Sequence, residues 1–270
     1  MCGHSGAVSE HARLRGYGTW ALVCGASEGI GAAFATQLVE AGLSVVLVAR
    51  RAGPLEAFAA TLRRPGVEVR AVALDLGAPE AEATLRQLSA EHAFGVVVYN
   101  AALSILRPFL DTPLADKQAI IDVNVRGPLM VADVLGHAMA ARGRGALILM
   151  SSLTALWGSP WVATYGATKA FNLSLGEALA AEWGPRGVDV LVCCAGATTT
   201  PGFLRAADGR KHAPAQPPEA VAAEALAAVG RRAVLVPGRL NRLATRVLGW
   251  LPRRWAVRIM GGETAKLLRV

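Results

Sequence analysis

The chain has 270 residues, of which 53% are hydrophobic and 18% charged, a balance that excludes a disordered protein. It contains no run of about 18 apolar residues, so no transmembrane helix is expected, and residues 1–18 lack the apolar stretch of a signal peptide. A globular, cytoplasmic protein with one well-filled core is predicted. Neither a disulfide framework nor a metal site is expected, because no C-x-x-C pair occurs among Cys2, Cys24, Cys193 and Cys194.

The net charge of +8 is concentrated at the C-terminal end of the chain. Residues 231–270 contain ten basic side chains and one acid, Glu263, whereas residues 1–230 sum to −1. A basic tail on a nearly neutral body is no sign of a nucleic-acid-binding surface, so we expect no nucleic-acid partner.

Short apolar runs alternate with helical patterns along most of the chain. Strands that are covered by helices on both faces read as nearly continuous apolar runs, so this alternation predicts a doubly wound parallel α/β sheet of about seven strands. The expected strands are residues 20–24, 44–49, 68–74, 95–99, 146–151, 188–194 and 233–236. The expected helices are residues 31–41, 55–63, 79–91, 115–142, 165–183 and 218–229.

The pattern predicts one domain over residues 1–238, in which residues 1–16 can be flexible and residues 205–218 resemble a mobile, proline-rich loop. Residues 239–270 are expected to form a basic helical extension that packs on the same domain or on a partner subunit. The alternatives are a lid over the cleft, or contact of residues 239–260 with a membrane surface. The extension begins with an amphipathic helix, whose apolar face comprises Leu240, Leu243, Ala244, Val247, Leu248 and Leu251.

A glycine-rich turn follows the first strand and opens the first helix. Glycines at these positions let the chain turn tightly, let the backbone approach a pyrophosphate and let the helix pack on the strand, while the helix N-terminus attracts the anion. A dinucleotide site is therefore predicted, and the alternative is a turn without a ligand. The turn comprises Gly25, Ser27, Glu28, Gly29, Ile30 and Gly31.

The end of the second strand indicates which dinucleotide binds. An acidic residue there accepts hydrogen bonds from the ribose of NAD, whereas an arginine pairs with the 2′-phosphate of NADP. Ala49 takes the acidic position and Arg50 follows it, with Arg51 and Ser27 as further candidates, so NADP is expected. The alternative is that the two arginines only make an exposed loop soluble and do not contact a cofactor.

The third strand ends at Asp75 and Leu76, which are placed beside the predicted nucleotide. The Asp75 carboxylate either accepts a hydrogen bond from the adenine amino group or caps the helix that follows. The sequence leaves both interpretations open.

Tyr165 and Lys169 are four residues apart in a helical pattern, so both side chains reach the same cavity. A free tyrosine has a pKa near 10 and is a poor acid–base catalyst at neutral pH. A lysine cation beside the phenol stabilises the phenolate and lowers that pKa, so the pair is typical of proton transfer.

By these motifs the sequence resembles the short-chain dehydrogenase/reductase family over residues ~17–237, which implies a Rossmann-type fold. The resemblance implies that Ser152 orients the substrate, and that Asn124, in a kinked helix, helps to hold a water linking Lys169 to solvent. The cofactor contacts that it implies are Asn100, Ala101, Tyr165, Lys169, Gly196, Thr198 and Thr200. The sequence departs from the family pattern, in ways that affect packing, at Cys24, Tyr99, Ala102 and Ala195.

The resemblance implies hydride transfer between the nicotinamide and a carbonyl carbon, with NADPH-dependent reduction as the favoured direction. Ser152 and Tyr165 then hydrogen-bond the carbonyl oxygen, and Tyr165 delivers the proton. Two other classes stay open: a relative that epimerises or dehydrates with a retained cofactor, and a non-catalytic NADP sensor. A sensor would be expected to have lost Tyr165 or Lys169.

The loops beyond the strand ends carry an apolar and aromatic set of candidate substrate contacts. This set favours a hydrophobic ketone or aldehyde, such as a steroid-like, fatty or aromatic one; the alternative is that these side chains close the core or a subunit interface. The set comprises Leu103, Ile105, Leu153, Trp157, Trp161, Phe203 and Leu204.

The two long helical patterns, residues 115–142 and 165–183, predict a homodimer or homotetramer, because the family commonly associates through these helices. The second pattern carries a stripe that could meet a symmetry-related copy. That stripe consists of Phe171, Leu175, Leu179 and Trp183.

Overall fold

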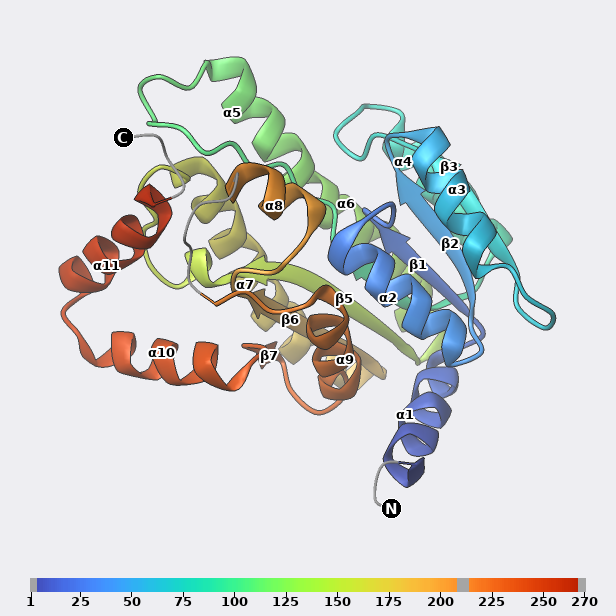
Figure 1. Cartoon of the computed structure of the whole chain (residues 1–270). Helices are drawn as coiled ribbons and strands as arrows, with labels where there is room; N and C mark the ends of the chain where they lie inside the picture. The colour runs from blue at the N-terminus through green and yellow to red at the C-terminus, as the bar shows by residue number, and fades with distance from the viewer. Residues whose placement is uncertain (1–3, 208–213, 267–270) are drawn as a thin grey trace.

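A computed structural model describes residues 4–207 and 214–266 of the chain. Its centre is a seven-stranded sheet in the order β3-β2-β1-β4-β5-β6-β7, in which every neighbouring pair is parallel (Figure 1). The strand order reverses between β1 and β4, which places a crevice beyond the ends of these two strands. The strands are β1 (Trp20–Cys24), β2 (Ser44–Ala49), β3 (Val69–Ala73), β4 (Phe94–Tyr99), β5 (Gly145–Ser152), β6 (Val188–Ala195) and β7 (Val234–Leu235).

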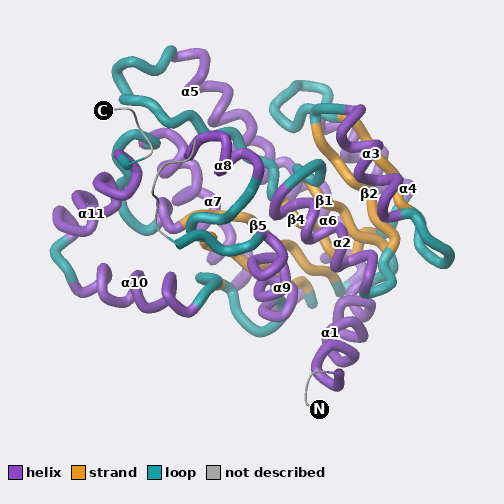
Figure 2. The backbone as a smooth tube through the Cα atoms, viewed as in Figure 1, coloured by secondary structure: helices purple, strands orange, loops and turns teal. Residues whose placement is uncertain are grey.

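Helices cover both faces of the sheet, and each face has its own apolar core (Figure 2). One core contains buried residues of α2, α3 and α9, and the other contains those of α4 and α6. The apolar runs predicted as strands are buried for this reason, and the predicted doubly wound fold is confirmed. The helices are α1 (His4–Tyr17), α2 (Gly29–Glu40), α3 (Ala52–Leu62), α4 (Ala81–Glu91), α5 (Leu114–Ile121), α6 (Gly127–Arg142), α7 (Ala163–Trp183), α8 (Pro201–Ala207), α9 (Pro218–Ala228), α10 (Arg239–Trp250) and α11 (Arg253–Ala265).

The helix predicted over residues 115–142 is divided by a π-helical turn, Asp122–Arg126, between α5 and α6. The Val123 carbonyl accepts a hydrogen bond from the Tyr99 hydroxyl at 2.6 Å, and the Gly127 N–H donates to Asp122, five residues back. The wider turn therefore follows from a side chain that takes the carbonyl of an ordinary helical bond.

The N-terminal segment forms the helix α1, and its C-terminal half contacts the domain. Leu14 is buried in the core beneath α1, and the Arg13 guanidinium donates to the Leu226 carbonyl at 2.7 Å. The Arg15 guanidinium donates to the Ala41 carbonyl at 3.0 Å. These contacts join α1 to the ends of α2 and α9.

The C-terminal extension forms two helices, α10 and α11, at the edge of the domain (Figure 1). The polar side of α10 contacts the domain, where Arg242 forms an ion pair with Glu224 at 2.7 Å. The predicted apolar face does not pack on its own domain: Leu240 is 69% exposed and Leu243 is 59% exposed. In the described part of the chain, no helix is long and apolar enough to cross a membrane.

The stripe predicted on α7 packs at least in part within its own subunit. Leu179 and Trp183 lie against the core that contains α6, and Trp183 lies so close to Gly136 that a Cβ there would be 2.3 Å from its ring. The exposed side of α7 instead carries small residues, including Ala167, Ser174 and Ala178. Leu179 and Trp183 therefore face their own subunit, and a contact of Phe171 and Leu175 with a second copy stays a prediction.

The loop predicted over residues 205–218 begins within α8, a helix that the sequence pattern did not predict. Residues 208–213 of that loop lie outside the described part of the chain, as does Cys2. Cys24, Cys193 and Cys194 are free and buried.

Candidate active site

The glycine-rich turn leaves β1 beside the end of β4. Gly25 adopts a φ of +79°, and its N–H donates to the Val48 carbonyl at 2.7 Å. The Asn100 amide, which follows β4, donates to the Gly25 carbonyl at 2.9 Å. A Cβ at Gly31 would lie 2.0 Å from that same carbonyl, so this position requires glycine. Contacts with Val48, Asn100 and Gly31 therefore fix the conformation of the turn, and α2 begins at Gly29 within it.

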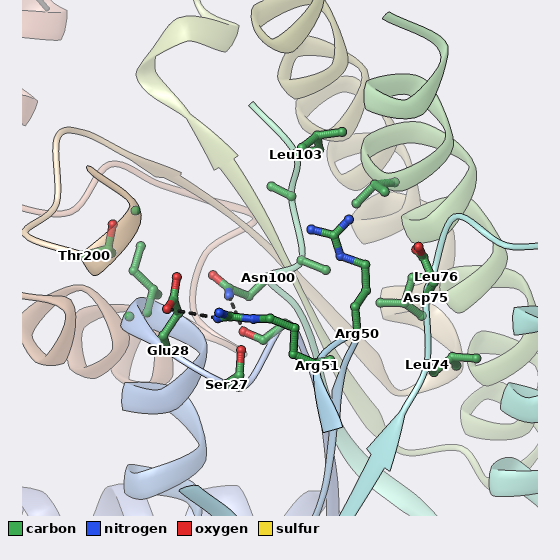
Figure 3. Close-up of a pocket in the computed structure, with 18 residues that line it drawn as sticks. Ser27, Glu28, Arg50, Arg51, Leu74, Asp75, Leu76, Asn100, Leu103 and Thr200 are labelled. Atoms are coloured by element: carbon green, nitrogen blue, oxygen red, sulfur yellow. Dashed lines mark hydrogen bonds and ion pairs between the residues drawn. The ribbon is translucent and has the colours of Figure 1, made fainter. Parts of the chain in front are cut away.

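A cavity of about 300 Å³ lies in front of this turn (Figure 3). It is lined by the turn and by the residues that follow β2, β3 and β4, as the sequence predicts for the adenosine half of a dinucleotide. The structure brings together here Gly25, Ser27, Glu28, Gly29, Ile30, Arg50, Arg51, Asp75, Leu76, Asn100, Ala101 and Thr200. It adds Leu74, Val123 and Gly202, which the sequence analysis missed because apolar and glycine positions carry no chemical signal.

The two arginines at the end of β2 differ in their partners. Arg51 is paired with the Glu28 carboxylate at 3.3 Å, and the same carboxylate accepts from Arg205 of α8 at 2.9 Å. Arg50 forms no ion pair with any residue that the structure describes, and it lines the cavity (Figure 3). Arg50 is therefore the guanidinium that is available to an anionic ligand.

Asp75 does not cap α4, so one of the two alternatives left open by the sequence is wrong. Its carboxylate accepts from the Gly77 N–H at 3.0 Å, within the turn that follows β3, whereas the residue that precedes α4 is Glu80. Asp75 and Leu76 both line the cavity. The second alternative, a contact with the adenine, stays a prediction.

A second cavity of about 240 Å³ adjoins the first and shares Ile30, Asn100, Ala102 and Thr200 with it. It lies at the ends of β5 and β6 and at the first turns of α7. The predicted residues that it brings together are Ser152, Tyr165, Lys169, Gly196, Thr198, Thr200 and Phe203. The two cavities therefore form one groove across the strand ends.

Burial raises the pKa of Tyr165 to about 12, and a hydrogen bond with the Ser152 hydroxyl lowers it in part. Ser152 is the last residue of β5, and its oxygen also accepts from the Thr154 N–H at 3.2 Å. The structure thus brings two hydroxyl groups together at one end of the groove. A ligand oxygen placed between them would receive two hydrogen bonds.

Lys169 is 2% exposed, and its ammonium donates to the Met150 carbonyl at 2.8 Å. Burial lowers the pKa of Lys169 to about 8, while the neighbouring Cys194 thiol acts in the opposite direction. The ammonium lies 5.5 Å from the centre of the Tyr165 ring. The Ser152 hydroxyl thus lowers the Tyr165 pKa, and the same effect of the Lys169 ammonium stays a prediction.

Asn124 is buried in the π-helical turn and connects three segments. Its amide donates to the Leu103 carbonyl at 2.9 Å and to the Thr168 hydroxyl at 3.1 Å, and its oxygen accepts from the Leu103 N–H at 2.8 Å. It therefore joins the segment after β4 to α7, one residue from Lys169. The helix interruption that the family resemblance implied is present here.

The predicted substrate residues do not form one surface. Phe203 lines the second cavity, whereas Trp157 lines a separate groove together with Val257 of α11. The 3₁₀ turn Leu153–Ala155 lies between the end of β5 and Trp157 in the sequence. Trp161, with a φ of +71°, lies beside Tyr165 and Ile105 in a small third cavity. Leu103 lines the first cavity, and Leu204 is exposed on α8.

Comparisons with known proteins agree with this architecture. The family described as short chain dehydrogenase matches residues 19–210. A 7beta-hydroxysteroid dehydrogenase of Collinsella aerofaciens is 36% identical over 232 residues, which cover 84% of this chain and 88% of the relative.

Two solved structures are similar over most of the fold. One, from work on 7beta-hydroxysteroid dehydrogenase stereoselectivity, has a TM-score of 0.85 and 34% identity and covers 92% of this chain and 98% of its own. The other, a short-chain dehydrogenase from Sphingobium yanoikuyae in complex with NADPH, has a TM-score of 0.74 and 28% identity and covers 85% and 94%. The chain is an oxidoreductase that belongs to the short-chain dehydrogenase/reductase family.

Proposed function

We propose that the protein catalyses NADPH-dependent reduction of a hydrophobic, steroid-like ketone, and the reverse oxidation of the corresponding alcohol. The observation that carries this proposal is the meeting of Ser152, Tyr165 and Lys169 in a cavity continuous with a nucleotide-shaped groove. An enzyme that transfers hydride to a carbonyl needs a cofactor site and a proton donor side by side, and this groove contains candidates for both.

The residues present fit a nicotinamide dinucleotide. The glycine turn and the N-terminus of α2 would receive the pyrophosphate, and the cavity between Ile30 and Lys169 would receive the nicotinamide. When bound, the cofactor supplies or accepts the hydride. Lys169 is proposed to hydrogen-bond the nicotinamide ribose.

The proton transfer is assigned to this chain's own side chains. Ser152 and Tyr165 donate hydrogen bonds to the carbonyl oxygen of the substrate, and the Tyr165 hydroxyl delivers the proton as that oxygen gains charge. Tyr165 is protonated at neutral pH, and the lowering of its pKa that proton transfer needs is assigned to the Ser152 hydroxyl and the Lys169 ammonium. Asn124 is proposed to keep α7 and the segment after β4 in register, so that the proton path from Lys169 stays in place.

The preference for NADP is proposed from the end of β2. No carboxylate stands at Ala49, and Arg50 lines the cavity without an ion-pair partner in the described part of the chain. A guanidinium forms charge-assisted hydrogen bonds with a phosphate. Arg51 contributes less in this proposal, because Glu28 already neutralises it.

The substrate class is proposed from the relatives and from the apolar side chains near the groove. A relative that is 36% identical over most of both chains is named a 7beta-hydroxysteroid dehydrogenase. Phe203 of α8 lines the cavity beside Tyr165, and Leu103 lines the cavity in front of the glycine turn. Such side chains bury a large apolar substrate better than a small polar one.

We also propose a homodimer or homotetramer that associates through α5, α6 and α7. Leu114, Ile121 and Leu129 are exposed on α5 and α6, and α7 exposes small residues. Apolar side chains exposed together indicate a protein interface. The basic extension is proposed to pack on a partner subunit, and a cytoplasmic location stays a prediction from the sequence.

The test is a substrate panel with purified protein and NADPH. The panel contains keto-steroids, medium-chain and aromatic ketones, and small polar ketones, and the loss of NADPH is followed by absorbance. The expected result is turnover that is highest with keto-steroids. Turnover only with small polar ketones would contradict the substrate class, and NADPH binding without turnover on any ketone would favour the sensor.

A further inference from the structure

The loop that follows β6 forms one wall of the candidate active site, and residues that do not line the cavity hold it in place. Ala197, Thr198 and Thr200 of this loop line the cavity beside Tyr165 and Lys169. The Thr198 hydroxyl donates only to the Gly196 carbonyl, at 3.1 Å, within the loop itself. The position of the loop therefore depends on what packs behind it.

Gln216 holds the back of this loop through main-chain hydrogen bonds. Its N–H donates to the Ala197 carbonyl at 2.9 Å, and its carbonyl accepts from the Thr199 N–H, also at 2.9 Å. These bonds form a short parallel bridge between Thr198 and Gln216. The bridge closes the base of the segment that carries α8.

Asn241, in the first turn of α10, meets Gln216 from the other side. The side-chain amides of the two residues hydrogen-bond at 3.0 Å, and the Asn241 amide also donates to the Pro237 carbonyl at 2.9 Å. The same amide covers Gly196: a Cβ at Gly196 would lie 2.6 Å from Asn241 Nδ2, and its three nearest atoms would all belong to the Asn241 amide.

The start of α10 is fixed independently of this contact. Glu224 of α9 accepts from the Gly238 N–H at 2.9 Å and forms the ion pair with Arg242. Arg242 also donates to the Val236 carbonyl at 3.1 Å. The first turn of α10, which carries Asn241, is thus fixed by contacts with α9 and with the segment after β7.

We propose that Gln216 and Asn241 are positioning residues for the nicotinamide half of the site. They hold the segment from Gly196 to Thr200 against the cavity, so the first turn of the C-terminal extension is part of the active-site support rather than an appendage. Neither side chain lines the cavity, so both act through the loop. This inference rests on the proposed nicotinamide site and adds the residues that fix one of its walls.

The first test compares Asn241→Ala with Thr245→Ala, a control one turn further along α10, whose hydroxyl donates only within its own helix. Without cofactor, hydrogen exchange at the Thr199 amide should rise in Asn241→Ala and stay unchanged in the control. NADPH should bind about fivefold more weakly to Asn241→Ala, as expected for the loss of one or two hydrogen bonds. Adenosine 2′,5′-bisphosphate, which lacks the nicotinamide half, should bind both variants equally well.

Two outcomes would overturn the inference. One is unchanged exchange at Thr199 together with unchanged NADPH binding; the other is an equal loss of NADPH and adenosine bisphosphate, which would indicate general destabilisation. The exchange measurement needs no cofactor and no substrate. Failure of the proposed function, seen as absent NADPH binding in the unmutated protein, is therefore distinct from failure of this inference.

A second test uses the contact between Gly196 and Asn241. Gly196→Ala should weaken NADPH binding, because the new methyl group meets the Asn241 amide. The double variant Gly196→Ala/Asn241→Ala should bind NADPH more tightly than Gly196→Ala alone, since the amide is gone. If the two changes weaken binding additively, the contact does not position the loop.

Discussion

Arg50 should determine the preference for NADP, and the structure separates its contribution from that of its neighbour. Arg50 lines the adenosine side of the groove without an ion-pair partner among the described residues, whereas Arg51 is paired with Glu28 at 3.3 Å. A charge-assisted contact with the 2′-phosphate is worth about 1–3 kcal/mol. Arg50→Ala should therefore narrow the difference in affinity between NADPH and NADH by a factor of about 5 to 150.

The assay is a fluorescence titration of the unmutated protein, Arg50→Ala and Arg51→Ala with each cofactor at low and at high salt. Arg51→Ala is the matched control: it removes a guanidinium of the same loop that is already paired with Glu28, and Glu28 keeps Arg205 as a partner at 2.9 Å, so the effect of this variant on NADPH binding should be smaller. The NADH affinity should change little in Arg50→Ala, because NADH has no phosphate at that position. Equal affinity of the unmutated protein for both cofactors would refute the reasoning, as would a larger effect of Arg51→Ala.

Three further predictions concern the buried lysine, the helix interruption and the assembly. Burial lowers the pKa of Lys169 in the folded state to about 8, below the 10.5 of an exposed lysine, so between pH 8 and 10 the folded state binds fewer protons than the unfolded state and the free energy of unfolding should rise with pH. Lys169→Met should lack this rise when unfolding by denaturant is measured without cofactor at several pH values. Parallel curves of stability against pH for the two proteins would contradict the prediction. Tyr99→Phe should lower the free energy of unfolding by about 1–2 kcal/mol, because it leaves the Val123 carbonyl without its hydroxyl donor, and an unchanged unfolding midpoint would show that the bond is not needed. Light scattering should find a dimer or tetramer at both low and high salt; a monomer that sediments with anionic vesicles only at low salt would favour the membrane alternative instead.

Most of the seven strands could be predicted from the sequence because burial on both faces makes them nearly continuous apolar runs, whereas the edge strand β3 is only partly buried and contains Arg70. The runs that became β1, β2, β5 and β6 carry this signal within five to eight residues. The glycine turn and the Tyr165–Lys169 pair could also be predicted, because each is defined by a few characteristic residue types at short spacing in the sequence. Local patterns of this kind need no knowledge of distant contacts.

The features that were missed depend on contacts between distant parts of the chain. The break at Asp122–Arg126 requires the hydroxyl of Tyr99, and no periodicity within the helix marks its position. Gln216 and Asn241 meet the loop after β6 only once the C-terminal extension has folded back. Trp157 was expected in the substrate cleft, but it lines a separate groove together with Arg253 and Val257 of the folded-back C-terminal extension.

The central claim is that Tyr165 donates the proton in a reduction that uses NADPH, and the turnover of Tyr165→Phe tests it most directly. The variant should fold and bind NADPH as the unmutated protein does, because the ring and its packing are retained. Its turnover on the best ketone of the panel should fall by a factor of at least ~100, as expected for the loss of a general acid. Turnover near the unmutated rate, with NADPH binding intact, would contradict the account.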